Sequence, residues 1–231
     1  MAFDPSKYTV AKARPLPVIL LLDRSGSMGG EKISTLNSAV NEMISSFKTA
    51  GQGEVDINLG VISFGDGGAT YDLPLQSVAG ITGIALQANG GTPMGKALMM
   101  AKDLLEDKEV IPSKGYRPAV VLVSDGAPND GWEQPMSDFI SGGRSSKCER
   151  FAMAIGTDQN DPVLNKFLSG TENKVFLASD ASKIRDFFKF VTMSVSVRSR
   201  SQNPNALLPA ASSPTSMTAI EDMAKEFGID L

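Results

Sequence analysis

Two aspartates end the two most apolar segments of the sequence. Asp23 follows the run PVILLL at 17–22, and Asp125 follows the run PAVVLVS at 118–124. Segments that are apolar throughout are typical of strands buried on both faces of a parallel sheet. Ligands bind such sheets where the carboxyl ends of the central strands meet. We therefore expect the two carboxylates to lie close together at one edge of a sheet.

Three hydroxyl side chains could join these carboxylates. Ser25 and Ser27 follow Asp23 at two-residue intervals, and alternate side chains of an extended segment point the same way. Thr92 lies in a glycine-rich segment before an expected helix. Two carboxylates and three hydroxyls make a set of oxygen ligands, which hard cations such as Mg²⁺ prefer. The same hydroxyls could instead serve turns and caps, with Thr92 as N-cap and Pro93 as first helical residue.

The composition excludes several other kinds of site. The chain of 231 residues has no histidine and one cysteine, Cys148. Histidine-based nucleophile pairs and histidine- or cysteine-rich zinc sites are therefore excluded, so any metal must be bound by oxygen. Cys148 is expected to pack at the start of a strand rather than react.

The net charge and the length of the longest apolar run indicate which partners and which location to expect for the protein. The net charge of −4 offers no electrostatic support for a nucleic-acid partner. The apolar run at 16–22 is too short to span a membrane, and the N-terminal residues lack a secretory signal pattern. We predict a cytoplasmic protein that binds neither nucleic acid nor membrane.

Hydrophobic periodicity predicts strands and helices that alternate along the chain. The expected strands are at 17–22, 55–64, 69–73, 118–124, 150–156 and 174–178. The expected helices are at 32–48, 94–106, 135–141, 161–168 and 180–196, with a long loop at 74–91. This alternation predicts an α/β fold, a doubly wound and mostly parallel six-stranded sheet with helices on both faces. The short segment at 69–73 would be its one antiparallel edge strand.

The ends of the chain differ in composition from its middle. We predict an N-terminal arm at 1–14 and one domain at 15–197. A linker rich in serine and proline follows at 198–216, and a short amphipathic helix at 217–231, which starts with a pattern like a capping box. Arg198 is interpreted as a solvated charge of the linker.

The site residues together resemble a known family. Asp23-x-Ser25-x-Ser27, Gly-Gly-Thr92-Pro-Met-Gly and Ser-Asp125-Gly resemble the metal-ion-dependent adhesion site of von Willebrand factor type A (vWA) domains. The resemblance covers roughly 15–197 and implies their Rossmann-like fold. It also implies a metal ion, Mg²⁺ or Mn²⁺ with Ca²⁺ as a third candidate, held by Asp23, Ser25, Ser27, Thr92 and Asp125.

The resemblance also implies a function. In the family, the aspartates often act through bound water, and one coordination position stays open for a carboxylate of a partner protein. The implied function is metal-dependent protein–protein interaction, without catalysis. Within the family, the segments LLDRSGSM and VSDGAP look most like bacterial intracellular TerY proteins, associated with tellurium resistance and stress. This implies an adaptor in stress response or phosphorylation signalling, with a protein kinase or PP2C-type phosphatase as partner.

Two other functions stay open, a Mg²⁺-dependent phosphatase and a metal-free structural subunit, whereas a serine hydrolase fits the sequence poorly. A Mg²⁺-dependent phosphatase of the haloacid dehalogenase type also begins with an aspartate after a buried strand, but it needs a second aspartate where this chain has Ser25. A serine-hydrolase elbow at Ser27 would lack its first glycine and its histidine. The other alternative is a metal-free structural subunit in which the site is vestigial.

Overall fold

The computed structural model describes residues 13–50, 55–156, 160–201, 205 and 222. Within them lies a six-stranded sheet with the strand order β3-β2-β1-β4-β5-β6. The strands are β1 (Arg14–Asp23), β2 (Val55–Gly65), β3 (Gly68–Ser77), β4 (Ala119–Ser124), β5 (Glu149–Ile155) and β6 (Phe176–Ala178). The helices are α1 (Glu31–Ala50), α2 (Met94–Glu106), α3 (Glu133–Ser141), α4 (Pro162–Phe167) and α5 (Ala181–Arg200). Single 3-10 turns occur at η2 (Gly26–Met28), η3 (Val78–Gly80) and η4 (Ser145–Lys147).

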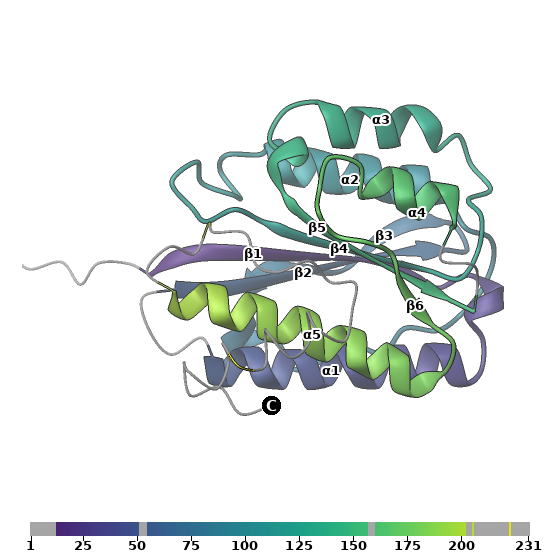
Figure 1. The fold of residues 1–231 in the computed structure, drawn as a ribbon, viewed down its shortest axis with the longest axis horizontal. Coiled ribbons are helices and arrows are strands. Elements are labelled where there is room, and N and C mark those ends of the chain that lie inside the picture. Colours follow the sequence, from purple (N-terminus) through teal and green to yellow (C-terminus); the bar gives the residue numbers. More distant parts are fainter. Residues whose placement is uncertain (1–12, 51–54, 157–159, 202–204, 206–221, 223–231) are drawn as a thin grey trace, which may run out of the picture.

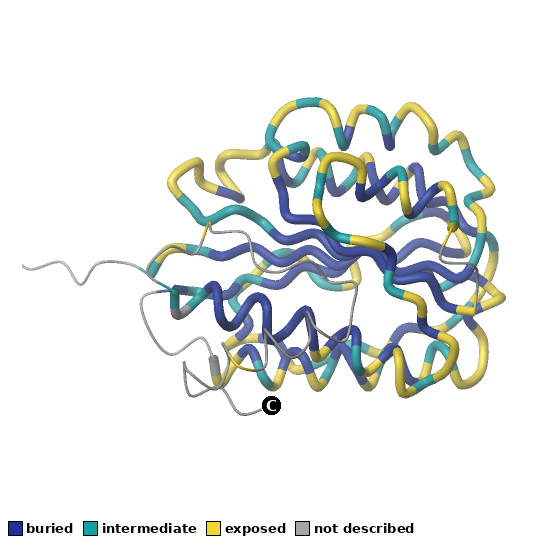
Figure 2. Tube along the Cα trace, in the orientation of Figure 1, coloured by how far each residue is buried: buried dark blue, intermediate teal, exposed yellow. Residues whose placement is uncertain are grey.

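The sheet forms the middle layer of three. Helices α1 and α5 cover one face, and α2, α3 and α4 cover the other (Figure 1). The side chains of β1 alternate between the two cores: Leu20 and Leu22 pack on the side of α1 and α5, whereas Ile19 and Leu21 pack on the opposite side. Figure 2 shows the resulting buried band along the sheet. Strand β1 is therefore packed on both faces, and it ends at Asp23.

The predicted fold class is confirmed. Strand β1 pairs in parallel with β2 and β4, and β5 pairs in parallel with β4 and β6. Strand β3 pairs antiparallel with β2 and lies at the edge of the sheet. No helix among the described residues combines the length and apolar character that crossing a membrane requires.

Strand β3 is longer than the sequence predicts. It continues to Ser77, so residues 74–77 of the expected loop belong to the sheet. The loop is expected because the segment shows little hydrophobic periodicity, and Pro74 within it cannot donate a hydrogen bond to a neighbouring strand. An edge strand tolerates proline when its nitrogen faces away from the partner strand. The pairing of β2 with β3 also shifts register around Val61. This irregularity interrupts the alternation of buried and exposed side chains by which a strand is recognised in a sequence.

Both ends of α5 are fixed by charged side chains. At its start, the Asp180 carboxylate accepts hydrogen bonds from the backbone nitrogens of Ser182 and Lys183. Near its end, Arg198 donates from Nη1 to Glu149 Oε2 at 2.6 Å and from Nη2 to the Arg117 carbonyl at 2.6 Å.

The interpretation of Arg198 as a solvated charge is wrong. The side chain is 1% exposed, and residues 198–200 belong to α5 rather than to the expected linker. Its partner Glu149 comes from a distant strand, so the local sequence gave no sign of the pair. The expected arm up to residue 12 and the expected C-terminal helix, except Asp222, lie outside the described residues.

The thiol of Cys148 is expected to be unreactive in the folded protein. The residue is buried directly before β5, and burial raises the pKa of the thiol to about 12. Because the thiolate is the reactive form, Ellman's reagent at pH 8 should label the native chain far more slowly than the chain in guanidinium chloride. Equal labelling rates in the two states would contradict this packing.

Candidate metal centre

The expected site lies at the carboxyl ends of two adjacent strands. Strands β1 and β4 are parallel neighbours in which Leu22 is paired with Val123, so Asp23 and Asp125 follow one and two residues beyond this pair at the same edge of the sheet. The segment after Asp23 turns through η2 before α1 begins, beyond the end of β1 in Figure 1. The sheet thus brings the two aspartates together, as their positions after apolar runs predict.

A chain of hydrogen bonds joins four of the five expected ligands. Asp23 accepts from the backbone nitrogen of Ser25 at 2.8 Å and from the Ser124 hydroxyl at 2.6 Å. The hydroxyls of Ser25 and Ser27 lie 3.0 Å apart. The Ser27 hydroxyl donates to Asp125 Oδ1 at 2.7 Å. The polar atoms of these residues therefore converge on one small region.

The loop that carries Thr92 is fixed against the same region by its backbone. Gly26 donates to the carbonyl of Gly90 at 2.9 Å, which joins the first loop to the second. Asn129 then holds Thr92 from both sides: its side-chain oxygen accepts from the Thr92 nitrogen, and its backbone nitrogen donates to the Thr92 carbonyl, each at 3.1 Å. Gly90 has a φ of +77°, and a Cβ there would collide with the Asp66 backbone.

Thr92 does not cap α2, which is the alternative role that the sequence offered for it. Pro93 occupies the N-cap position without a side-chain hydrogen bond. The carboxylate of Asp130 caps the helix instead, accepting from the nitrogens of Gly95 at 3.0 Å and Lys96 at 3.1 Å. The Thr92 hydroxyl has no hydrogen-bond partner among the described residues. It is buried and is not committed to the helix.

Residues 18–190 match the family model of the von Willebrand factor type A domain. The chain belongs to this family. The matched region runs from β1 into α5 and includes all five expected ligands.

Curated relatives of this vWA domain are much longer proteins. Inter-alpha-trypsin inhibitor heavy chain H4 of Bos taurus is 26% identical over 194 residues, which cover 77% of this chain and 20% of the relative. The heavy chain 4 of Mus musculus is 25% identical over 187 residues, 74% of this chain and 19% of the relative. The chain thus spans about a fifth of their length.

Solved structures share the vWA fold at low identity. The pilus adhesin SpaC of Lactobacillus rhamnosus GG superimposes with a TM-score of 0.66 at 15% identity, covering 80% of this chain and 30% of the adhesin. A von Willebrand factor type A structure from Catenulispora acidiphila gives a TM-score of 0.58 at 21% identity. The match covers 78% of this chain and 42% of the other. These likenesses establish the fold alone. The likeness to TerY proteins, the complete metal site and the cytoplasmic location stay predictions.

The two carboxylates of this vWA domain have different surroundings. Asp23 is 0% exposed, and burial raises the pKa of its carboxyl. Hydrogen bonds from Ser124 and Ser25 oppose this shift, and the nearby charge of Asp125 adds to it. Asp125 has a cation beside it, because Lys32 Nζ lies 2.6 Å from its Oδ2 and donates to the Ser27 carbonyl at 3.2 Å.

The donor set fits a hard cation that binds oxygen. The described residues contain no group of three or more histidine, cysteine, aspartate or glutamate side chains that could hold a metal, so a metal here depends on the hydroxyls. Mg²⁺ and Mn²⁺ accept carboxylate and hydroxyl oxygens. The buried Asp23 carboxylate has no cation in contact with it among the described residues, and a bound cation would offset its burial.

Four residues of the site are not among the metal ligands expected from the sequence. Ser124 binds Asp23, and Lys32 binds Asp125. Asn129 and Asp130 fix the Thr92 loop and the start of α2. Ser124 could have been found, since it precedes Asp125 directly. The others are ordinary turn or helix residues in the sequence, and only the fold brings them to the site.

Proposed function

We propose that this vWA domain binds a partner protein through a divalent cation, Mg²⁺ or Mn²⁺. The ligands would be Asp23, Ser25, Ser27, Thr92 and Asp125. The observation that carries this proposal is the hydrogen-bonded chain from Asp23 to Asp125 through the two serines. A bound cation would supply a positive position for an oxygen of the partner.

The chemistry of the ligands favours an acidic partner. Members of the vWA family are protein–protein interaction modules. Hydroxyls are neutral, so a site with only two carboxylates leaves more positive charge on a cation than a cage of carboxylates does. A carboxylate of the partner would therefore contribute more than a neutral oxygen. The proposed setting is an adaptor in a bacterial stress or phosphorylation system, with a kinase or PP2C-type phosphatase as partner, supported by the TerY-like motif segments.

The enzymatic alternative, a Mg²⁺-dependent phosphatase, has less support. Its general acid would stand two residues after Asp23, and Ser25 occupies that position with its hydroxyl beside Ser27. We propose that the chain is not an enzyme. The purified chain with Mg²⁺ should give a flat trace with p-nitrophenyl phosphate, and a Mg²⁺-dependent rate lost in Asp23→Ala would favour the phosphatase.

Partner capture with and without metal tests the proposed function. The full chain on a resin should retain its partner in Mg²⁺ and release it in EDTA. Ser27→Ala, which removes one proposed ligand, should weaken retention. Ser38→Ala is the matched control, since Ser38 is exposed on α1. Retention that survives both EDTA and Ser27→Ala would refute the metal bridge, and the absence of any Mg²⁺-induced thermal shift would favour the metal-free subunit.

Lys32→Met is expected to raise the affinity for Mg²⁺. The ammonium contacts Asp125 Oδ2 at 2.6 Å and is 37% exposed, so it competes with a cation for this oxygen and repels it. A screened repulsion of about 1 kcal/mol corresponds to roughly a fivefold change in affinity. Isothermal titration with Mg²⁺ measures the change, and Lys48→Met at the far end of α1 is the control. An equal or weaker affinity in Lys32→Met would contradict this role.

A further inference from the structure

A second candidate site lies at the opposite end of the sheet. A cavity of about 360 Å³ opens where β4 and β5 begin and before β6. We call it the amino-end cavity. Its lining includes Arg117, Ser146, Lys147, Arg150, Glu172 and Asn173. None of these residues belongs to the candidate metal centre, so the cavity needs an explanation of its own.

The charge of the amino-end cavity is mainly positive. Arg117, Lys147 and Arg150 bring three cationic groups to its lining, against the carboxylates of Glu149 and Glu172. Glu149 is already paired with Arg198 at 2.6 Å. Glu172 and Lys147 are both exposed, so water screens both of these charges, which leaves Arg117 and Arg150. The positive charge inside the cavity is therefore not balanced by its own lining.

Arg150 is the decisive residue, because its guanidinium is buried without an anion. The side chain is 2% exposed. Its Nη1 donates to the Ser146 carbonyl at 3.1 Å and its Nη2 to the Ser169 carbonyl at 2.7 Å, whereas Nε has no hydrogen-bond partner among the described residues. No ion pair includes Arg150 in the described part of the chain. Buried charges in proteins are generally paired with an opposite charge. An anion that entered the cavity would supply this missing partner to the guanidinium.

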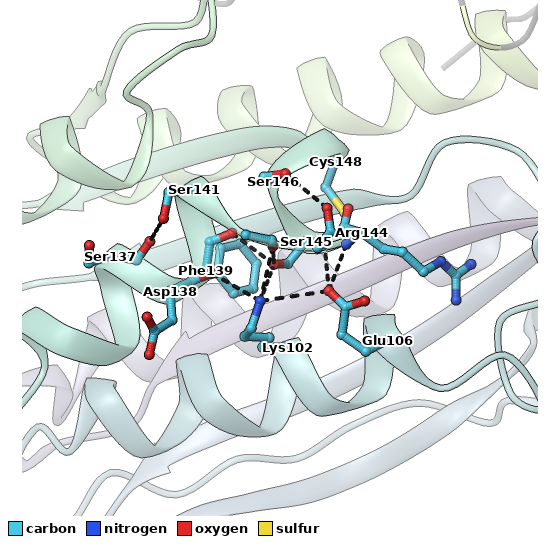
Figure 3. A network of polar contacts seen from close by, with 12 residues as sticks. Lys102, Glu106, Ser137, Asp138, Phe139, Ser141, Arg144, Ser145, Ser146 and Cys148 are labelled. Carbon is cyan, nitrogen blue, oxygen red and sulfur yellow. Dashed lines mark hydrogen bonds and ion pairs between the residues drawn. The ribbon is translucent and has the colours of Figure 1, made fainter.

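The wall of the cavity around Ser146 is held rigidly. Figure 3 shows Lys102 and Glu106 of α2 reaching the turn that leads to Cys148. Glu106 Oε1 accepts from the backbone nitrogens of Arg144 at 2.6 Å and Ser145 at 3.3 Å. Lys102 Nζ donates to the Gly142 carbonyl at 3.0 Å and the Ser145 hydroxyl at 3.1 Å. A wall fixed in this way loses little conformational freedom when a ligand binds.

We propose that the amino-end cavity binds a small phosphate-class oxyanion, with Arg150 as its principal ligand. The planar guanidinium matches the oxygens of a phosphate through parallel N–H groups. Arg117 and Lys147 add positive charge from the lining. This site is separate from the metal centre and does not depend on the proposed function.

Titration of the full chain with inorganic phosphate tests the proposal. EDTA is present throughout, so that phosphate cannot act through a metal ion. The melting temperature should rise with phosphate and saturate, whereas sodium chloride at the same ionic strength should not reproduce the rise. Ribose 5-phosphate, titrated in parallel, distinguishes a site for the free anion from a site for a small phosphate ester, according to which binds more tightly.

Variants locate the binding. Arg150→Met should weaken phosphate binding at least ~10-fold, since one lost charged contact is worth about that much. Because a substitution at a buried position can prevent folding, Lys147→Gln at an exposed position is the second variant, with roughly threefold weakening expected. Lys108→Gln, exposed and outside the cavity, should leave the affinity unchanged. Equal effects of phosphate and chloride, or unchanged affinity in Lys147→Gln, would overturn the proposal.

Discussion

Asp23→Asn is expected to abolish stabilisation by Mg²⁺ while leaving the metal-free fold at least as stable as before. The carboxylate is fully buried at the end of β1, and its raised pKa means that folding disfavours the ionised form. An amide of the same shape removes both the burial of charge and the repulsion from Asp125. It also removes the charge that would hold a cation. One substitution should thus have opposite effects in the absence and presence of metal.

Chemical denaturation in EDTA and in excess Mg²⁺ measures both effects. At a Mg²⁺ concentration 100 times the dissociation constant, the wild type gains about 2.7 kcal/mol from binding, and Asp23→Asn should lose this gain. Asp103→Asn, at an exposed position of α2, is the matched control and should keep it. The metal assignment fails if Mg²⁺ stabilises Asp23→Asn as much as the wild type.

Arg198→Met is expected to destabilise the fold by about 3–5 kcal/mol, because it leaves the buried carboxylate of Glu149 without its cation. The two side chains are nearly inaccessible to solvent and lie 2.6 Å apart. Burial raises the pKa of Glu149, and the charge of Arg198 opposes that shift. In the variant this opposition is lost, so the pKa of Glu149 in the folded state rises further.

The raised pKa of Glu149 determines how the stability of Arg198→Met depends on pH. A carboxyl whose pKa is higher in the folded than in the unfolded state favours folding at low pH, and this contribution is lost as pH rises. The deficit of Arg198→Met should therefore be larger at pH 8 than at pH 5, as measured by urea unfolding at both values. The double variant Glu149→Gln with Arg198→Met should recover much of the loss, since it removes both charges of this buried pair. A deficit that is independent of pH would argue against an unpaired Glu149.

The central features of the site could be predicted because they are local in sequence. Apolar runs that end in Asp23 and Asp125 indicate neighbouring buried strands, and the spacing of Ser25 and Ser27 places their hydroxyls near the first aspartate. Hydrophobic periodicity was sufficient for the order of strands and helices. These patterns concern short segments, where a single physical preference dominates.

The remaining features depend on contacts between distant segments. Lys32 in the first turn of α1 looks like an ordinary surface residue, yet the turn η2 brings it to Asp125. Arg198 lies in a serine-rich region that resembles a linker, yet it pairs with Glu149, which precedes it by 49 residues. Asp130 replaced Thr92 as the cap of α2 for the same reason. Partners of this kind are decided by how the layers pack.

The fixed ends of α5 also determine how the domain would respond to mechanical force. A slide of the helix by one turn would move its backbone by about 5.4 Å. Such a movement would separate Arg198 from Glu149, which lie 2.6 Å apart, and would break a buried ion pair. Tension along α5 would load this pair, which joins the helix to the first residue of β5, together with the packing of α5 in the core. The candidate metal centre lies at the other end of the sheet, so a tether attached there would pull on the domain from the opposite side.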